Sequence, residues 1–275
     1  MKEKLVSKKQ IQGWVPSLNT RFGGLIIDWG MALFGLNKVN GVYDRCKMYE
    51  GVEFCKHVLD DIGVKIVAEN ADVISRFDGV PFVTVSNHPY GHVDALGIIS
   101  IVGKMRPDYK VTANFILSLI DTMSAHFIRV NPYEKDNMIA GAASVRNCLD
   151  HMDSRRPLGF FPAGAVSVPK LTWKGFAVKD GPWKPSTVRM IRKAGVPVIP
   201  VWVSGQNSWI YNLLGLFGWR LRTIRLPHEL FNKRGKTVVV RFGEPVMPEE
   251  FANIKSGREL AEFFKTRVYA LADRK

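Results

Sequence analysis

Residues 80–94 read VPFVTVSNHPYGHVD, an apolar β-rich run that ends in a short loop of polar and turn-forming residues. An apolar helical stretch, residues 94–105, follows at once. In α/β folds, catalytic groups gather in the loops at the carboxyl ends of strands, where side chains stand over a fixed sheet. This strand, loop and helix therefore predict the fold class and the place of the chemistry together.

The same alternation continues along the chain. Further strands are expected at residues 109–113, 127–130, 158–161, 198–203 and 237–242, and further helices at 135–151, 186–194 and from Ser256 onward. This pattern predicts an α/β domain with a mostly parallel central sheet flanked by helices, over residues 71–275. Residues 1–70 space their apolar residues helically and are expected to form a helical N-terminal extension.

His88 and Asp94, on this loop, are a pair that can carry out acid–base chemistry. A carboxylate beside a histidine orients one ring tautomer and stabilises the imidazolium, so the histidine can act as a general base near neutral pH. The rival interpretation is a turn capped by Asp94, with His88 in solvent. Three neighbours are expected to line a substrate site: Asn87, Gly91 and His92.

The spacing His88-x3-His92-x-Asp94 also brings three potential metal ligands together. Catalytic metal sites require further His or carboxylate ligands, and the other histidines form no recognisable ligand pair. We therefore expect no metal site. The cysteines form neither an even framework nor a C-x-x-C pair, so a disulfide scaffold is not expected either.

Two later segments, like residues 80–94, combine an apolar strand with a loop of small or polar residues. Residues 159–167, GFFPAGAVS, follow a short apolar strand and end in small residues that let a substrate approach the backbone. Residues 196–208, VPVIPVWVSGQNS, form an apolar strand flanked by prolines and a polar loop.

In this order and at these separations, NHPYGHVD, FFPAGAVS and VPVIPVWVSGQNS resemble the motifs of the phospholipid/glycerol acyltransferase superfamily, over roughly residues 50–250. The His-x5-Asp spacing and the FPAG form are similar to its haemolysin-like bacterial branch, which includes O-acyltransferases of lyso-ornithine and lyso-glycine lipids. The resemblance implies the glycerolipid acyltransferase fold and an O-acyltransferase similar to those of 1-acylglycerol-3-phosphate.

The resemblance also implies roles for individual residues. His88 would deprotonate the acceptor hydroxyl, supported by Asp94, and the hydroxyl would attack the thioester of acyl-ACP or acyl-CoA, with no bound cofactor. Substrate contacts would come from the FPAG loop: Phe161, Pro162, Ala163 and Gly164. Arg129 is the nearest candidate for the phosphate-binding arginine of the second motif. Ala163 and Ala165 stand where the family often has Glu, which weakens the case for a glycerol-phosphate acceptor.

Charge is concentrated in one part of the chain. The net charge is +14, and residues 170–241 hold 14 basic and 2 acidic residues. This concentration indicates an anionic partner. No zinc finger, RNP-like motif or helix-turn-helix pattern accompanies it, so a nucleic acid is not expected. A bilayer surface with its lipid acceptor is expected, and an acyl carrier protein is a further candidate partner.

Residues 194–219 are uncharged, but prolines and polar residues interrupt them, so a spanning helix is the weaker interpretation. Apolar and aromatic residues followed by arginines are typical of an interfacial segment. A buried helix with solvated arginines is the rival. The expected membrane contacts are Trp209, Leu213, Leu216, Phe217, Trp219, Arg220 and Arg222. With no apolar stretch of a signal peptide at the N-terminus, we expect a peripheral protein on the cytoplasmic side of the inner membrane.

The leading hypothesis is thus a membrane-associated acyltransferase acting on the hydroxyl of a lysolipid. Two alternatives stay open on the same fold. The acceptor could be an amine or water, giving an N-acyltransferase or a thioesterase, or the protein could bind lipid without catalysis.

Overall fold

The structure is a computed structural model that describes residues 4–113, 120–130, 138–172 and 175–273. A seven-stranded sheet runs in the order β1-β9-β8-β2-β5-β3-β4. Its strands are β1 (Lys65–Glu69), β2 (Val83–Ser86), β3 (Lys110–Ala113), β4 (Phe127–Arg129), β5 (Leu158–Phe160), β8 (Val198–Val203) and β9 (Thr237–Phe242). Every neighbouring pair is parallel except β8 and β9. The predicted mostly parallel α/β sheet is confirmed.

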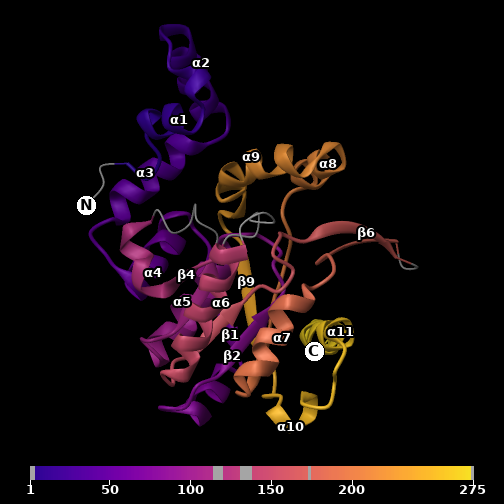
Figure 1. The fold of residues 1–275 in the computed structure, drawn as a ribbon. Coiled ribbons are helices and arrows are strands. Elements are labelled where there is room, and N and C mark those ends of the chain that lie inside the picture. The colour runs from indigo at the N-terminus through magenta and orange to yellow at the C-terminus, as the bar shows by residue number, and fades with distance from the viewer. Residues whose placement is uncertain (1–3, 114–119, 131–137, 173–174, 274–275) are drawn as a thin grey trace.

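Helices cover both faces of this sheet (Figure 1). Their bounds are α1 (Lys8–Trp14), α2 (Arg21–Leu33), α3 (Leu36–Cys46), α4 (Gly51–Asp61), α5 (Val93–Met105), α6 (Met138–Asp153), α7 (Pro185–Ala194), α8 (Trp209–Phe217), α9 (Trp219–Glu229), α10 (Pro248–Phe251) and α11 (Gly257–Tyr269). Short 3-10 turns lie at Pro16–Leu18, Ala71–Phe77, Asp121–His126 and Phe231–Lys233.

Two buried hydrophobic clusters lie between the sheet and the helices on its two faces. One packs α3, α4 and α5 against one face of the sheet, and the other packs α6, α7 and α11 against the opposite face. β8 shows why: Ile199, Val201 and Val203 enter the first cluster, whereas Val198 enters the second. Because successive strand residues point to opposite faces, a continuous apolar strand is buried on both sides.

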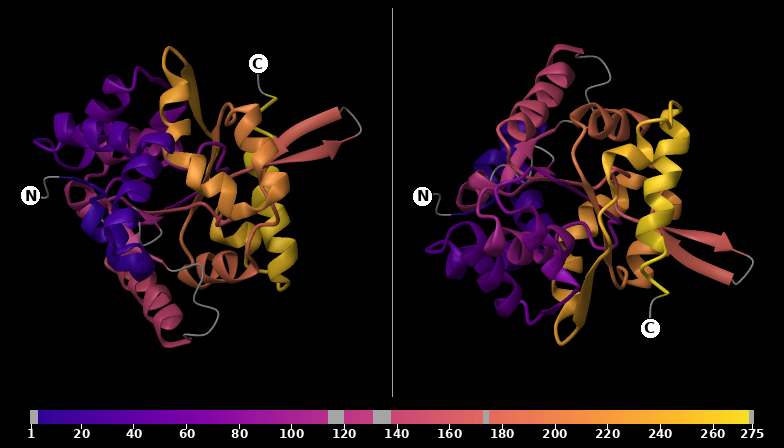
Figure 2. Two further views of the ribbon diagram at one scale, coloured as in Figure 1. Left: turned by 90° about the horizontal axis from the view of Figure 1, so that it is seen from above. Right: turned by 90° about the horizontal axis from the view of Figure 1, so that it is seen from below.

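The residues expected to form a helical extension are indeed mostly helical, but they also contain β1, an edge strand paired with β9. Beyond the large sheet, β6 (Val168–Thr172) and β7 (Gly175–Lys179) form an antiparallel hairpin. Figure 2 shows this hairpin projecting from the body of the molecule. Among helices in the described part of the chain, none has the length and apolar character needed to cross a bilayer.

Candidate active site

His88 and Asp94 face each other at the carboxyl edge of the sheet. His88 lies in the loop after β2, and Asp94 lies in the first turn of α5. The distance from His88 Nδ1 to Asp94 Oδ2 is 2.8 Å; the carboxylate is fully buried and the imidazole is 15% exposed. The oxygen lies off the direction of an ideal Nδ1–H bond, so this is a close approach of the ring nitrogen to the carboxylate rather than an aligned hydrogen bond. With Nδ1 facing the carboxylate, Nε2 is the nitrogen available to take a proton.

Asp94 also fixes the backbone of the loop that carries His88. Its carboxylate accepts hydrogen bonds from the backbone N–H of Tyr90 at 3.0 Å and of Gly91 at 2.9 Å. Gly91 has φ +97°, and a Cβ there would lie 2.9 Å from Val166 Cγ2. Glycine is therefore required at this position both for backbone conformation and for packing. Asp94 thus caps the turn, as the rival interpretation expects, but His88 lies against its carboxylate rather than in solvent.

The FPAG loop, which follows β5, lies against His88. The ring of Phe161 packs against the imidazole in a tilted arrangement, with 4.2 Å between centroids and 30° between planes. The loop closes through a hydrogen bond of 2.9 Å from Gly164 N–H to the Phe161 carbonyl. Pro162 and Ala163 turn inward and are buried, while Gly164 is exposed. Of the predicted substrate contacts on this loop, Phe161 is thus the one shown touching His88.

Asn87 and His92 hold the loop to its surroundings. The amide of Asn87 donates to the Val203 carbonyl at 2.9 Å and accepts from the Val203 N–H at 2.7 Å. The Nε2 of His92 donates to the Leu226 carbonyl on α9 at 2.8 Å. Burial lowers the pKa of His92, which favours the neutral ring. These contacts give both residues a positioning role.

The loop after β8, which contains the GQN sequence of the third segment, holds Tyr90. Gly205 has φ +94°, and a Cβ there would lie 1.8 Å from the Tyr90 hydroxyl. The amide of Asn207 donates to the Tyr90 carbonyl at 3.2 Å. Burial raises the pKa of Tyr90 to about 12, so its hydroxyl stays protonated.

Asp180 is a residue of the site that the sequence analysis did not find. Its fully buried carboxylate accepts from the His88 backbone N–H at 3.1 Å, the Ser167 hydroxyl at 2.6 Å and the Trp183 indole at 2.9 Å. It thereby ties the loop that carries His88 to the segment of residues 159–167. The signal that could have found it is its isolation: it is one of two acids among 14 basic residues.

Glu229, the other acid of that basic stretch, is also fully buried. It accepts from the Ser208 N–H at 2.9 Å and hydroxyl at 2.7 Å, and pairs with Lys233 at 3.1 Å. Burial alone would raise the pKa of Glu229, but the Ser208 hydrogen bonds and the Lys233 charge outweigh it and lower the pKa. Glu229 therefore joins the start of α8 to the end of α9.

Two arginines lie in places that the sequence did not indicate. Arg129 is exposed at the end of β4, three strands from β2, which corresponds to roughly 14 Å across the sheet. Arg222, expected among the exposed membrane contacts, is buried. It donates to the Val166 carbonyl at 2.9 Å and lies 5.6 Å from the centre of the Tyr211 ring. This corrects the expectation for Arg222, because α9 turns it inward onto the FPAG loop.

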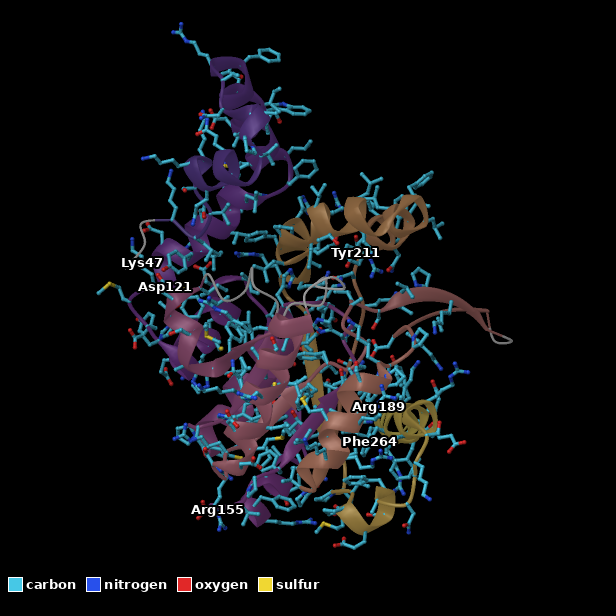
Figure 3. The ribbon with its side chains drawn as sticks, viewed as in Figure 1. Lys47, Asp121, Arg155, Arg189, Tyr211 and Phe264 are labelled. Atoms are coloured by element: carbon cyan, nitrogen blue, oxygen red, sulfur yellow. The ribbon has the colours of Figure 1, made fainter. Side chains whose placement is uncertain are left out.

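The outward side of α8 and α9 is apolar. The exposed residues there are Trp209, Leu213, Leu216 and Phe217 on α8, with Leu221 and Ile224 on α9. A second exposed set lies on α2: Phe22, Leu25, Ile26, Trp29 and Leu33. Figures 1 and 3 show α2, α8 and α9 at the same end of the molecule. We call these exposed residues the apolar end. The side chains of Trp219 and Arg220 lie outside those the structure describes.

Within the described residues, no group of three His, Cys, Asp or Glu side chains is placed to hold a metal ion. The His88–Asp94 pair beside Phe161 offers acid–base chemistry.

Comparison with known proteins finds relatives that cover most of this chain. A lyso-glycine lipid O-acyltransferase of Bacteroides thetaiotaomicron is 24% identical over 243 residues, covering 86% of this chain and 85% of the relative. One of Phocaeicola vulgatus is 24% identical over 234 residues, covering 80% and 78%. The crystal structure of the Thermotoga maritima 1-acyl-sn-glycerophosphate acyltransferase covers 91% of this chain and 95% of its own, with 18% identity and a TM-score of 0.48.

The sequence model of the acyltransferase family matches residues 10–274, nearly the whole chain. The predicted superfamily is thereby confirmed, and the chain is a member of the acyltransferase family.

Proposed function

We propose that this acyltransferase moves a fatty acyl group from the thioester of acyl carrier protein or coenzyme A to the hydroxyl of a lysolipid at a membrane surface. The observation that carries the proposal is the His88–Asp94 contact of 2.8 Å at the carboxyl edge of the sheet. The names of the two bacterial relatives support a lysolipid hydroxyl as the acceptor.

In this reaction His88 Nε2 takes the proton of the acceptor hydroxyl as its oxygen attacks the thioester carbonyl. The tetrahedral intermediate then collapses, the C–S bond breaks, and the leaving thiolate takes the proton from the imidazolium. The products are an ester and a free thiol, so no oxidant or further reactant is needed. Asp94 stabilises the imidazolium through Nδ1 and keeps the ring in orientation.

The site favours a lyso-aminolipid over a glycerol phosphate as acceptor. Ala163 stands where a glutamate would be expected for glycerol phosphate, and its side chain packs in the core rather than towards the acceptor. Arg129, the candidate phosphate ligand, is roughly 14 Å from β2 across the sheet. The relatives that are named for lyso-glycine lipids support the same choice.

The apolar end supports peripheral attachment to a membrane, and the cytoplasmic face of the inner membrane is the surface that we propose. Exposed apolar patches on soluble proteins mark binding surfaces. α8 and α9 join this end to the active site, because Leu226 and Arg222 of α9 contact the loops that surround His88. A lysolipid drawn from the bilayer would thus reach the site beside these helices.

Purified protein with vesicles that carry a lyso-glycine lipid tests the proposal. His88→Ala should lower the acyl-transfer rate by at least about 10³-fold while circular dichroism stays unchanged. His57→Ala, on α4, is the matched control and should leave the rate unchanged. Retained activity of His88→Ala would overturn the mechanism. Mass spectrometry of the products separates an ester from an amide or a free fatty acid, and a chain that binds vesicles without turnover would be a lipid-binding protein.

A further inference from the structure

The ammonium group of Lys184 lies beside the FPAG loop. The backbone N–H of Lys184 donates to the Pro162 carbonyl at 2.9 Å. Its side chain crosses the face of Gly164: a Cβ on Gly164 would lie 2.6 Å from Lys184 Nζ and 2.7 Å from its Cε. Glycine at 164, with φ +63°, therefore leaves the space that the lysine side chain fills.

This ammonium has no carboxylate partner among the described residues. Both acids of the surrounding basic stretch, Asp180 and Glu229, are fully buried and already hold other donors. The first turn of α7, directly after Lys184, also contains no acid. A partly buried cation without a counter-charge is stabilised when an anion binds to it.

Two neighbouring lysines, Lys265 and Lys179, are engaged elsewhere. Lys265 Nζ donates to the carbonyls of Asp180 and Gly181, and Lys179 Nζ lies 5.5 Å from the centre of the Tyr269 ring. Lys184 is therefore the better placed cation for a substrate at this loop.

Lys184 and His88 flank the same turn. His88 packs against Phe161 at one end, Lys184 covers Gly164 at the other, and the turn between them is closed by a hydrogen bond. Because the Cα atoms at the ends of such a turn lie within about 7 Å of each other, the His88 ring and the Lys184 ammonium group are on the order of 10 Å apart. The hydroxyl and the charged headgroup of one lysolipid are several bonds apart, a span of the same order.

We propose that Lys184 binds the anionic group of the acceptor headgroup, a carboxylate or a phosphate, and so selects anionic lysolipids. This inference rests on the proposed function. It assigns the recognition of the headgroup to a residue outside the motifs, in place of Arg129.

The test compares acceptor kinetics of the wild type and Lys184→Gln. The acceptors are a lysolipid that ends in the glycine carboxylate, its methyl ester, and a lysolipid with a phosphate headgroup. The KM for an anionic acceptor should rise about 10-fold to 100-fold in the variant, with kcat and the donor KM unchanged. The methyl ester should be used equally by both proteins. Lys184→Arg should keep most of the affinity.

Lys193→Gln, at the exposed far end of α7, is the matched control and should behave as wild type. A Lys184→Gln variant with an unchanged acceptor KM, or with a raised donor KM instead, overturns the assignment. If the KM rises more for one anionic acceptor than for the other, the anionic group of that acceptor, carboxylate or phosphate, is the one that Lys184 binds.

Binding measured in the His88→Ala background separates this inference from the proposed function. The probe is a phosphatidylcholine vesicle that contains about 10 mole per cent of the lysolipid that ends in the glycine carboxylate. Weaker binding after Lys184→Gln supports the lysine even if no acyl transfer is found in the wild type. Equal binding contradicts it even if acyl transfer is found.

Discussion

The loop of residues 87–92 is held on two sides, and the two sides differ in chemistry. On one side the buried carboxylates of Asp94 and Asp180 accept from backbone N–H groups, including that of His88 itself. On the other side the cover, by which we mean α8, α9 and the loop that precedes α8, contacts the loop through Asn207 and Leu226. The carboxylate side sets where the imidazole lies, whereas the cover closes the loop and carries an apolar outer surface. Changes on the first side should therefore affect catalysis, and changes on the second should affect stability and membrane binding.

Asp94→Asn should give the largest effect. The amide keeps the size of the side chain but removes the charge that stabilises the His88 imidazolium, so kcat should fall on the order of 10³-fold. Steady-state kinetics measures the loss, and a thermal unfolding curve shows whether the fold persists. A variant within tenfold of wild type would contradict the role of Asp94.

Asp180→Asn should have a smaller effect, roughly 10-fold to 100-fold on kcat with little change in KM, because it moves the His88 backbone rather than its charge partner. The amide oxygen can still accept from His88 and Ser167, but the NH2 group then meets the indole N–H of Trp183. Adding Trp183→Phe removes this clash of donors and should restore part of kcat. If the double variant is no better than Asp180→Asn, the residue is only a packing element.

Arg222→Met tests the cover. It leaves the Val166 carbonyl without its donor and should lower the free energy of unfolding by about 1–3 kcal/mol, with only a few-fold loss of kcat. Urea denaturation measures the first and steady-state kinetics the second. Arg258→Met, at an exposed position of α11, is the control and should change neither. A large loss of kcat without a loss of stability would place Arg222 on the catalytic side.

The cover should also weaken in acid. Burial lowers the pKa of His92 below its ordinary value of 6.5, so the unfolded chain binds the proton more readily than the folded one. The stability that the neutral ring contributes is complete above pH 6.5 and is lost as the pH falls below it. Unfolding free energies measured between pH 7.5 and 5.5 should decrease, and His92→Gln should reduce the slope. His151 and His228 act in the same direction, so some slope should remain. A slope unaltered by His92→Gln would show that this ring has no part in it.

The smallest effect on the chemistry is expected at the apolar end. Leu216→Ser with Phe217→Ser removes two side chains that are 74% exposed and should weaken vesicle binding by about tenfold or more. Turnover of a short-chain, water-soluble acceptor should not change. Val145→Ser, an exposed apolar residue on α6, is the control. Unaltered vesicle binding would leave α2 as the better candidate for contact with the bilayer.

Much of the fold could be predicted from the sequence, because long apolar strands and helical spacing are local signals. β2, β8 and β9 follow such signals. The sequence pattern does not predict β1, since KIVAE lies at the edge of the sheet and is only partly buried. The hairpin of β6 and β7 was missed because nothing local distinguishes its strands from the basic loop around them. The antiparallel direction of β9 depends on how the chain returns to the sheet, and no short pattern reports that.

The residues of the site also fall into those that a local pattern predicts and those that it does not. His88, Asp94 and Phe161 belong to motifs with a fixed local spacing, and the structure brings them together. Asp180 and the buried Arg222 act across long separations in sequence. Their roles depend on tertiary contacts, so residue type alone did not distinguish them from surface residues.

Those long separations bear on how the enzyme is made. His88 binds Asp180 across 92 residues, Asn87 binds Val203 across 116, and His92 binds Leu226 across 134. At the ribosome, where roughly 5–20 residues are added each second, Leu226 emerges several seconds after His88. A nascent or prematurely terminated chain that stops before Leu226 therefore has His88 and Asp94 but not the contacts that arrange them. Acyl transfer should begin only after Leu226 has emerged.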